Sequence, residues 1–217
     1  MAKPVSPRGQ GRERVLEAAL GLFAVHGVSG TSLQMIADLL GVTKASVCFQ
    51  FHSKEGIVVA LLEPVFEQVD VLITRAEQPG LGGHSTEGEH WEATLTDLTR
   101  LVVAHRRVFA VLRGDNVAAE LVEINPAWRA IIERIARFLL GADPSTYQLV
   151  AASVFGAGLM LVERDHQMAD LDDETLVTEL VACGRRLLAP AGRAMATPRA
   201  EEISRHGRGE QPSDSFR

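Results

Sequence analysis

The residues most able to do chemistry form a short stretch near the N-terminus, from Lys44 to Gln50. Their types predict a short helix, with Thr43 as its N-terminal cap. The outward positions of this helix carry small or polar side chains, so it could enter a narrow groove. The DNA major groove admits an α-helix, and small side chains allow close approach to base edges. The residues predicted to contact bases or adjoining phosphates are Lys44, Ala45, Ser46, Cys48, Phe49 and Gln50.

Cationic and hydroxyl side chains on either side of this stretch predict contacts with a phosphate backbone. Lys54 follows Ser53, which can cap the next helix, and the free amides of that helix's first turn would point at the same phosphate. The residues predicted to position the DNA backbone are Arg12, Arg14, Thr31, Ser32 and Lys54.

Other kinds of functional residue form no constellation in the sequence. The seven histidines are scattered without an i, i+4 pair, and neither cysteine belongs to a Cys-x-x-Cys motif, which argues against a metal site. No nucleophile elbow, P-loop or dinucleotide fingerprint occurs. We therefore expect no metal, no cofactor and no enzymatic activity.

Two features allow more than one interpretation. Oxidation or alkylation of Cys48 would obstruct entry into a groove, although Lys44 is the only nearby charge that would favour a thiolate. His105, Arg106 and Arg107 could bind an anion, or they could simply lie at a helix end where cations interact with the helix dipole.

A helix–turn–helix arrangement must position the groove-facing helix. Thr31 and Gln34 have the spacing of a capping box at the start of a first helix. Gly41, which can adopt a positive φ, predicts the end of that helix. Its buried side is predicted to consist of Leu33, Ile36, Ala37 and Leu40. A preceding helix over residues 11–26, ended by Gly27, would hold this pair through Val15, Leu16, Ala19, Leu22 and Phe23.

Residues 12–62 resemble the TetR family of bacterial transcription regulators. The shared features are a basic start, Phe-Ala-x-x-Gly, Thr-Ser-x-x-x-Ile-Ala, Gly-Val-Thr-Lys and Ser-Lys-Glu. The resemblance implies an all-α fold with an N-terminal three-helix head and a C-terminal helical domain for effector binding and dimerisation. It implies a homodimeric regulator, a repressor that leaves a palindromic operator on double-stranded DNA when a small-molecule effector binds.

One departure from the family pattern concerns the groove-facing helix itself. Family members usually have Tyr-Tyr-His or Tyr-Trp-His where this chain has Cys48-Phe49-Gln50. Phenolic oxygens at this point commonly contact the DNA backbone, and a thiol or a phenyl ring cannot replace them. The departure supports an alternative hypothesis, a helical ligand-binding or catalytic protein with a vestigial helix-turn-helix.

The charge distribution favours a polyanionic partner for the head. The 217-residue chain has a net charge of −6, but residues 1–54 carry +3 and residues 55–189 carry −10. A basic head on an acidic body orients toward DNA by its head, unless the asymmetry is only a solvated surface without consequence. Two distant cysteines and an N-terminus without an apolar core, MAKPVSPRGQGR, predict reduced thiols, no secretion signal and a cytoplasmic protein.

The rest of the chain predicts a helical body. We expect a flexible arm at residues 1–10, the DNA-binding domain at 11–54, the effector and dimerisation domain at 55–189, and a disordered tail at 190–217. The arm could reach DNA or have no role. Pro64 should kink or break the connecting helix, and the Gly-rich segment 78–90 should be a lid or a link.

The last two predicted helices are apolar enough to be buried. Residues 145–164 contain the mostly apolar, uncharged stretch LVAASVFGAGLMLV, whose fourteen residues are too few for a membrane span of roughly 20. Ala152, Gly156 and Gly158 would let a neighbouring backbone approach, and Asp172 should cap the final helix. By resemblance, these two helices form the homodimer interface.

By resemblance, the body also encloses an effector pocket. Trp128 and Tyr147 are favoured because a buried indole N–H or phenol needs a polar partner that a ligand could supply. The full set of candidate lining residues, each of which could equally be ordinary core, is Phe66, Trp91, Leu98, Phe109, Trp128, Tyr147 and Phe155.

Overall fold

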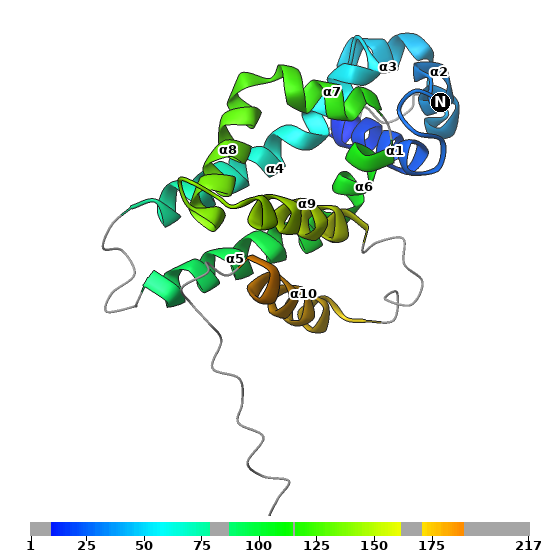
Figure 1. The fold of residues 1–217 in the computed structure, drawn as a ribbon. Helices are drawn as coiled ribbons and strands as arrows, with labels where there is room; N and C mark the ends of the chain where they lie inside the picture. The colour runs from blue at the N-terminus through cyan, green and yellow to red at the C-terminus, as the bar shows by residue number, and fades with distance from the viewer. Residues whose placement is uncertain (1–9, 79–86, 115, 162–170, 189–217) are drawn as a thin grey trace, which may run out of the picture.

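The structure is a computed structural model that describes residues 10–78, 87–114, 116–161 and 171–188. Within these ranges the chain forms α-helices and no strand, as the sequence predicts (Figure 1). The helices are α1 (Gln10–His26), α2 (Leu33–Leu40), α3 (Lys44–Gln50), α4 (Lys54–Ala76), α5 (Glu87–Ala104), α6 (Arg106–Gly114), α7 (Asn116–Ile124), α8 (Pro126–Leu140), α9 (Thr146–Leu161) and α10 (Asp173–Leu188).

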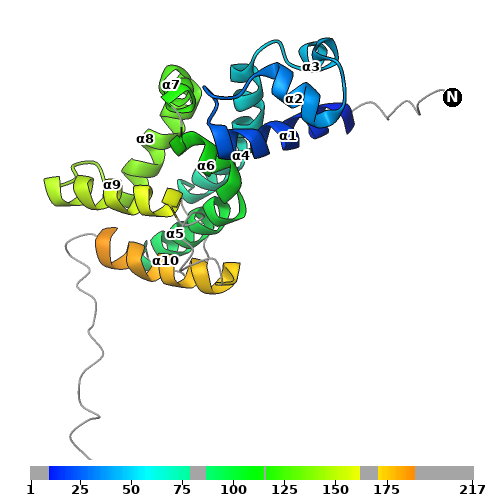
Figure 2. The same ribbon diagram turned by 90° about the vertical axis from the view of Figure 1, so that its right-hand side faces the viewer.

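The head consists of α1, α2 and α3 packed on the start of α4. Apolar side chains from each of these helices meet in its core, including Ala19, Phe23, Ile36, Val47 and Ile57. Figures 1 and 2 show α2 and α3 at one end of the molecule, and α9 and α10 at the other. This arrangement leaves α3 on the outside of the head.

The start of α2 differs from the predicted capping box. Ser32, not Thr31, is the N-cap, and its Oγ accepts a hydrogen bond from the amide of Met35 at 3.2 Å. Thr31 is only 3% exposed and donates from Oγ1 to the carbonyl of Gly27 at 2.7 Å. The side chain of Gln34 donates to Asp38 and does not accept from the Thr31 amide, as a capping box would require. Thr31 therefore joins the α1–α2 turn to the core, and the neighbouring serine caps the helix.

The other turn signals of the head are confirmed. Gly41 ends α2 with φ 64°, a conformation that favours glycine. Thr43 caps α3, since its Oγ1 accepts from the amide of Ser46 at 3.2 Å. Ser53 caps α4 by accepting from the amide of Gly56 at 3.1 Å. These local contacts fix the direction of α3 relative to the helices behind it.

The connecting helix α4 runs from the head into the body without interruption. Pro64 lies inside it, so the predicted break does not occur. A proline removes one backbone hydrogen bond, but the remaining turns and the packing around α4 maintain the helix. Its buried side chains belong to both the head and the body, among them Ile57, Leu62, Phe66 and Ile73.

Helix α10 packs closely against α9 and α5 at Gly184, a residue for which the sequence predicted no such role. A Cβ added to Gly184 of α10 would lie 2.8 Å from Cζ of Phe155 and 3.1 Å from a methyl group of Leu95. Around Gly156 and Gly158 of α9 there is open space instead. Close approach within the described residues therefore depends on α10, not on the small residues of α9.

Several boundaries in the body differ from the predictions. The helix α5 begins at Glu87, inside the predicted 78–90 loop, and α7 was not predicted. Ser145 caps α9, because its Oγ accepts from the amide of Gln148. The Ser145 amide in turn donates to the Gln148 side chain, so the two residues form a capping box. The predicted arm, most of the Gly-rich segment and the tail lie outside the described residues. None of the described helices has the length and apolarity that a membrane span needs.

Side-chain caps begin both α8 and α10, and the cap of α10 is the predicted one. Asn125 caps α8 ahead of Pro126, and Gly141 ends it. Asp172 precedes α10 and accepts from both the amide and the hydroxyl of Thr175 at 2.9 Å. These hydrogen bonds from Thr175 lower the pKa of Asp172.

Ion pairs tie distant helices of the body to one another and to the head. Arg134 of α8 binds Asp70 of α4 and Glu77, the C-cap of α4, with its Nη2 2.6 Å from Glu77 Oε2. Arg107 of α6 binds Glu17 of α1 at 2.8 Å. Arg106 binds Asp173 at 2.6 Å. Arg106 and Arg107 are thus paired with carboxylates of the chain itself. These contacts do not support the alternative in which the two arginines bind an external anion.

Candidate functional site

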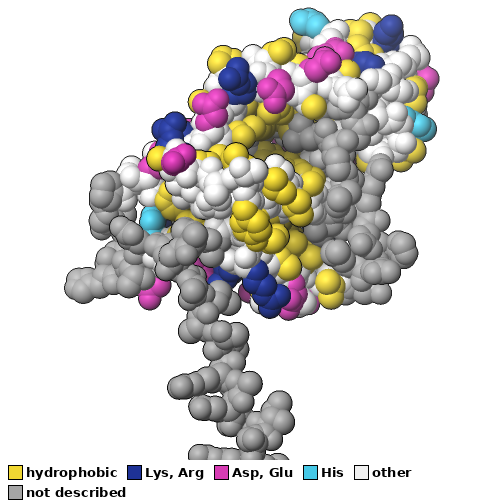
Figure 3. Space-filling model, in the orientation of Figure 1, with side chains coloured by type: hydrophobic (Ala, Val, Ile, Leu, Met, Phe, Trp, Pro, Cys, Tyr) yellow, Lys and Arg dark blue, Asp and Glu magenta, His cyan; other side chains and the backbone are white. Residues whose placement is uncertain are grey.

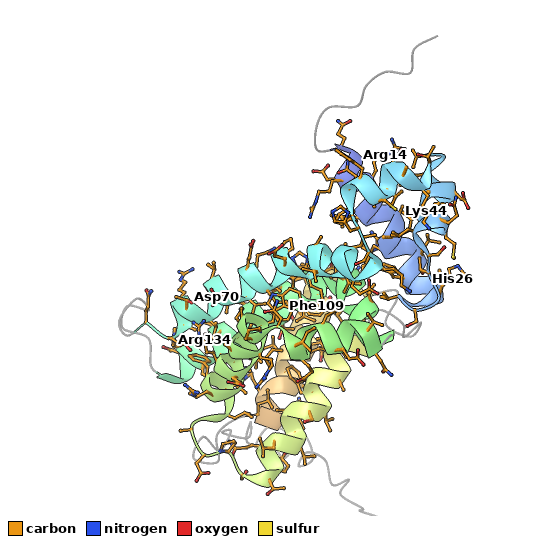
Figure 4. All side chains as sticks on the ribbon, turned by 90° about the horizontal axis from the view of Figure 1, so that it is seen from above. Arg14, His26, Lys44, Asp70, Phe109 and Arg134 are labelled. Carbon is orange, nitrogen blue, oxygen red and sulfur yellow. The ribbon has the colours of Figure 1, made fainter. Side chains whose placement is uncertain are left out.

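The helix α3 presents most of its surface to solvent. Val47 is fully buried and fixes the helix to the head core, while Cys48 is half-buried. The other residues predicted to contact bases are exposed, namely Lys44, Ala45, Ser46, Phe49 and Gln50. Figure 4 shows Lys44 and Arg14 on the head, well away from Asp70 and Arg134. The geometry is that of a short helix able to enter a groove.

Two arginines of α1 lie on the same domain as α3. Arg12 is exposed, and its guanidinium lies 4.8 Å from the centre of the Phe51 ring, directly after α3. A cation held over an aromatic ring keeps its N–H groups available to an anion. Arg14 is also exposed. The structure thus brings positive charge from α1 to the end of α3.

Thr31 and Lys54 do not lie as the sequence analysis expected for backbone contacts. Thr31 is buried, and its hydroxyl proton is used within the head. The Lys54 Nζ donates to the carbonyls of Val28 at 2.7 Å and Ser29 at 3.2 Å. Lys54 therefore connects the start of α4 to the segment between α1 and α2, because its ammonium group donates to two carbonyls of that turn. Ser32 remains exposed beside them.

A second site is a cavity of about 400 Å³ inside the body. Seven helices contribute to its wall, from α4 to α10. Thr99 carries the only polar side-chain group among its described lining residues, and its Oγ1 already donates to the carbonyl of Leu95 at 2.8 Å. Phe109, which Figure 4 labels among the body helices, reaches the cavity from α6.

Four of the seven candidate lining residues reach this cavity: Phe66, Leu98, Phe109 and Phe155. Trp91 does not, because its indole N–H donates to the carbonyl of Leu139 at 3.0 Å. Trp128 stacks on Phe66 with ring centres 4.6 Å apart and lies behind it. Tyr147 is 64% exposed on α9. Trp128 and Tyr147, the two favoured candidates, therefore do not line this cavity.

Most residues of the cavity wall were not predicted from the sequence. The missed residues are mainly aliphatic, including Val65, Val69, Leu95, Val102, Ile135, Leu139, Leu159 and Leu188. In the sequence their spacing is that of any core-facing residue, so no signal separates a cavity wall from filled core. Gly156, which the sequence analysis assigned to helix packing, also lines the cavity.

The surface of α9 carries large apolar side chains. Figure 3 shows hydrophobic side chains gathered over the part of the molecule where α9 lies in Figure 1. Tyr147, Leu149, Val150 and Val154 are each at least half exposed. Exposed apolar patches of this kind mark interaction surfaces.

Comparison with known proteins identifies the head. The family model for bacterial regulatory proteins of the tetR family matches residues 15–61, which include α2, α3 and the caps described above. The head is therefore similar in sequence to bacterial regulatory proteins of the tetR family. Curated relatives of the chain include the HTH-type transcriptional regulator RutR of Escherichia coli K12, 38% identical over 56 residues. TtgR of Pseudomonas putida is 38% identical over 66 residues.

The matches to these curated relatives are short. The aligned residues make up 26% of this chain and 26% of RutR, and 30% of this chain and 31% of TtgR. The chain thus matches less than a third of the length of either relative.

Solved structures extend the similarity of fold to the body. NalD of Pseudomonas aeruginosa, the secondary repressor of the MexAB-OprM multidrug efflux pump, is 23% identical with a TM-score of 0.59, over 82% of this chain and 95% of NalD. A tetR-family regulatory protein from Rhodococcus RHA1 is 19% identical with a TM-score of 0.59, over 83% and 97%. At this level of identity the likeness establishes the fold.

Proposed function

We propose that this chain is a sequence-specific DNA-binding regulator of transcription of the TetR type, and that it acts as a repressor. The observation that carries the proposal is the exposed helix α3, held by the caps of Thr43 and Ser53 and accompanied by Arg12 and Arg14. A bound repressor would occlude its operator, and α3 would read bases in the major groove. The positive charge of the head favours the same partner.

The regulator would act as a homodimer. The apolar side chains that α9 exposes, together with α10 beside it, supply a surface that a second copy could bury. Two-fold symmetry would then place two α3 helices on successive major-groove faces about 34–36 Å apart, which predicts a palindromic operator.

The effector would bind in the cavity of the body. A volume of about 400 Å³ is in the range of small-molecule sites. Burying an ionised group there would cost several kcal/mol or more, because the described lining offers no ionic partner. The effector is therefore an uncharged compound of mainly apolar surface.

The helix α6 provides the connection between the cavity and the head. Phe109 forms part of the cavity wall, and Arg107, two residues earlier, binds Glu17 of α1. The helix α4 also contributes to both parts, through Ile57 in the head and Phe66 in the cavity wall. An effector that displaces Phe109 or Phe66 would favour a different head position, provided that it binds the two states with different affinity.

Binding of the full chain to DNA tests the proposal. Random duplexes selected by the protein should yield a palindromic site, and sedimentation should show one dimer per site. Lys44→Ala should change sequence preference, whereas Glu133→Gln, on the exposed surface of α8, should leave it unchanged. A monomeric protein that retards no duplex even in dilute buffer would contradict the proposal and favour the ligand-binding or catalytic alternative.

A further inference from the structure

The outermost side chains of α3 are apolar, although the helix lies at the surface. Val47 points into the head core and is fully buried. Successive residues of a helix are rotated by about 100°, so Ala45 and Phe49 both lie nearly opposite Val47. Phe49 is 84% exposed, more than any other large apolar side chain in the described residues. The part of α3 that would approach DNA first is therefore the pair Ala45 and Phe49.

Polar and cationic residues flank this pair. By the same rotation, Ser46 and Gln50 lie on one side of it, and Lys44 and Cys48 lie on the other. The Ser46 hydroxyl is 2.9 Å from that of Thr43, so it takes part in the cap of the helix. The central contact of α3 thus lacks a hydrogen-bonding side chain, while its margins can bind phosphates.

The chemistry of the major groove restricts what an apolar pair can bind. Each base pair presents donors and acceptors there, and thymine also presents a C5-methyl group. A phenyl ring that covers a donor or acceptor leaves it without a hydrogen bond, which is unfavourable. Contact with a methyl group has no such cost and removes apolar surface of both partners from water.

We infer that Phe49, together with Ala45, recognises the C5-methyl group of thymine in each half-site of the operator. The inference rests on the proposed function and specifies how α3 recognises the bases of the operator. It assigns part of the base selection to shape and apolar contact at the centre of the helix, with Arg12 and Arg14 supplying attraction to the backbone.

The test compares thymine with uracil, which pairs identically with adenine but lacks the methyl group. The best site from selection on random duplexes is synthesised with deoxyuridine replacing each thymidine in turn. At one or two positions per half-site the affinity of the wild-type protein should fall about fourfold, the factor expected for one buried methyl group. At the remaining positions the affinity should not change.

Two variants show whether Phe49 is responsible. Phe49→Leu keeps an apolar side chain and should retain the difference between thymine and uracil, whereas Phe49→Ser should abolish it. Because Phe49 is exposed, both variants should keep the circular dichroism and unfolding midpoint of the wild type.

The outcomes separate this inference from the function on which it rests. Tight binding with no effect of uracil at any position would overturn the inference alone, as would a difference that persists in Phe49→Ser. Selected half-sites without thymine would also overturn it. Failure to select any duplex would overturn the proposed function and the inference together.

Discussion

Lys54 shows how a single residue can be assigned the wrong partner from sequence alone. Its place directly after the Ser53 cap predicts a phosphate contact, but its ammonium group binds the carbonyls of Val28 and Ser29. Those carbonyls belong to a segment about 25 residues earlier in the chain. The side chain therefore contributes to the stability of the head, whatever it adds to DNA binding.

Lys54→Met should lower the free energy of unfolding by about 1–2 kcal/mol, because two hydrogen bonds from a charged donor are lost. Lys44→Met is the matched control, since Lys44 is exposed on α3 and should change stability by less than about 0.5 kcal/mol. Urea denaturation followed by circular dichroism measures both. Equal stability of the Lys54 variant and the wild type would show that these hydrogen bonds are not maintained in solution.

At the scale of the element, the packing of α10 depends on the missing side chain of Gly184. Gly184→Val should destabilise the protein by about 2–3 kcal/mol, because its Cβ would overlap the Phe155 ring. Gly21→Val is the control, since Gly21 lies in α1 with open space around it. Thermal unfolding of the two variants would contradict the prediction if both had the same midpoint.

The pairing of α4 with α8 should depend on pH. The hydrogen bond from Arg134 lowers the pKa of Glu77 below its usual value of 4.5. A carboxylate with a lowered pKa in the folded state stabilises the protein above its unfolded pKa, and this contribution is lost as the pH falls through the folded pKa. Because Glu77 is 41% exposed, solvent screening limits the effect to about 1 kcal/mol or less.

We therefore expect Glu77→Gln to be less stable than the wild type by a constant amount above about pH 5, and by a decreasing amount below about pH 4. Chemical denaturation across this range measures the difference. In an Arg134→Gln background the same substitution should have a much smaller pH-dependent effect, because the main partner of the carboxylate is gone and only the weaker influence of Arg137 remains. A difference that persists unchanged at low pH would refute the role of this pair.

At the scale of the whole molecule, the cavity determines which compounds the protein can bind. An alkanol should raise the unfolding midpoint more than the carboxylate of equal chain length, because the described wall offers a buried charge no partner. Gly156→Leu should abolish the rise by filling the cavity, whereas Gly21→Leu should retain it. Preferred binding of the carboxylate would contradict the uncharged character proposed for the effector.

The amino-acid sequence determined the local structure of the head and the identity of its exposed helix. The ends of α2, α3 and α4 depend on Gly41, Thr43 and Ser53, whose contacts lie within a few residues along the chain. The helix caps of the body at Asn125 and Asp172 are predictable for the same reason. Thr31 was misassigned because it and Ser32 are both suitable caps, and only burial separates them.

The tertiary structure decided the partners of Lys54, the close contact at Gly184 and the cavity. Seven helices meet around the cavity. The cavity exists because side chains that are far apart in the sequence leave part of the space between these helices unfilled. Hydrophobic periodicity indicates which face of a helix turns inward, but it does not indicate whether a neighbouring helix supplies atoms to fill that space. For this reason α3 could be found by reading the sequence, whereas Ile135 and Gly156 became parts of a cavity wall only in the folded chain.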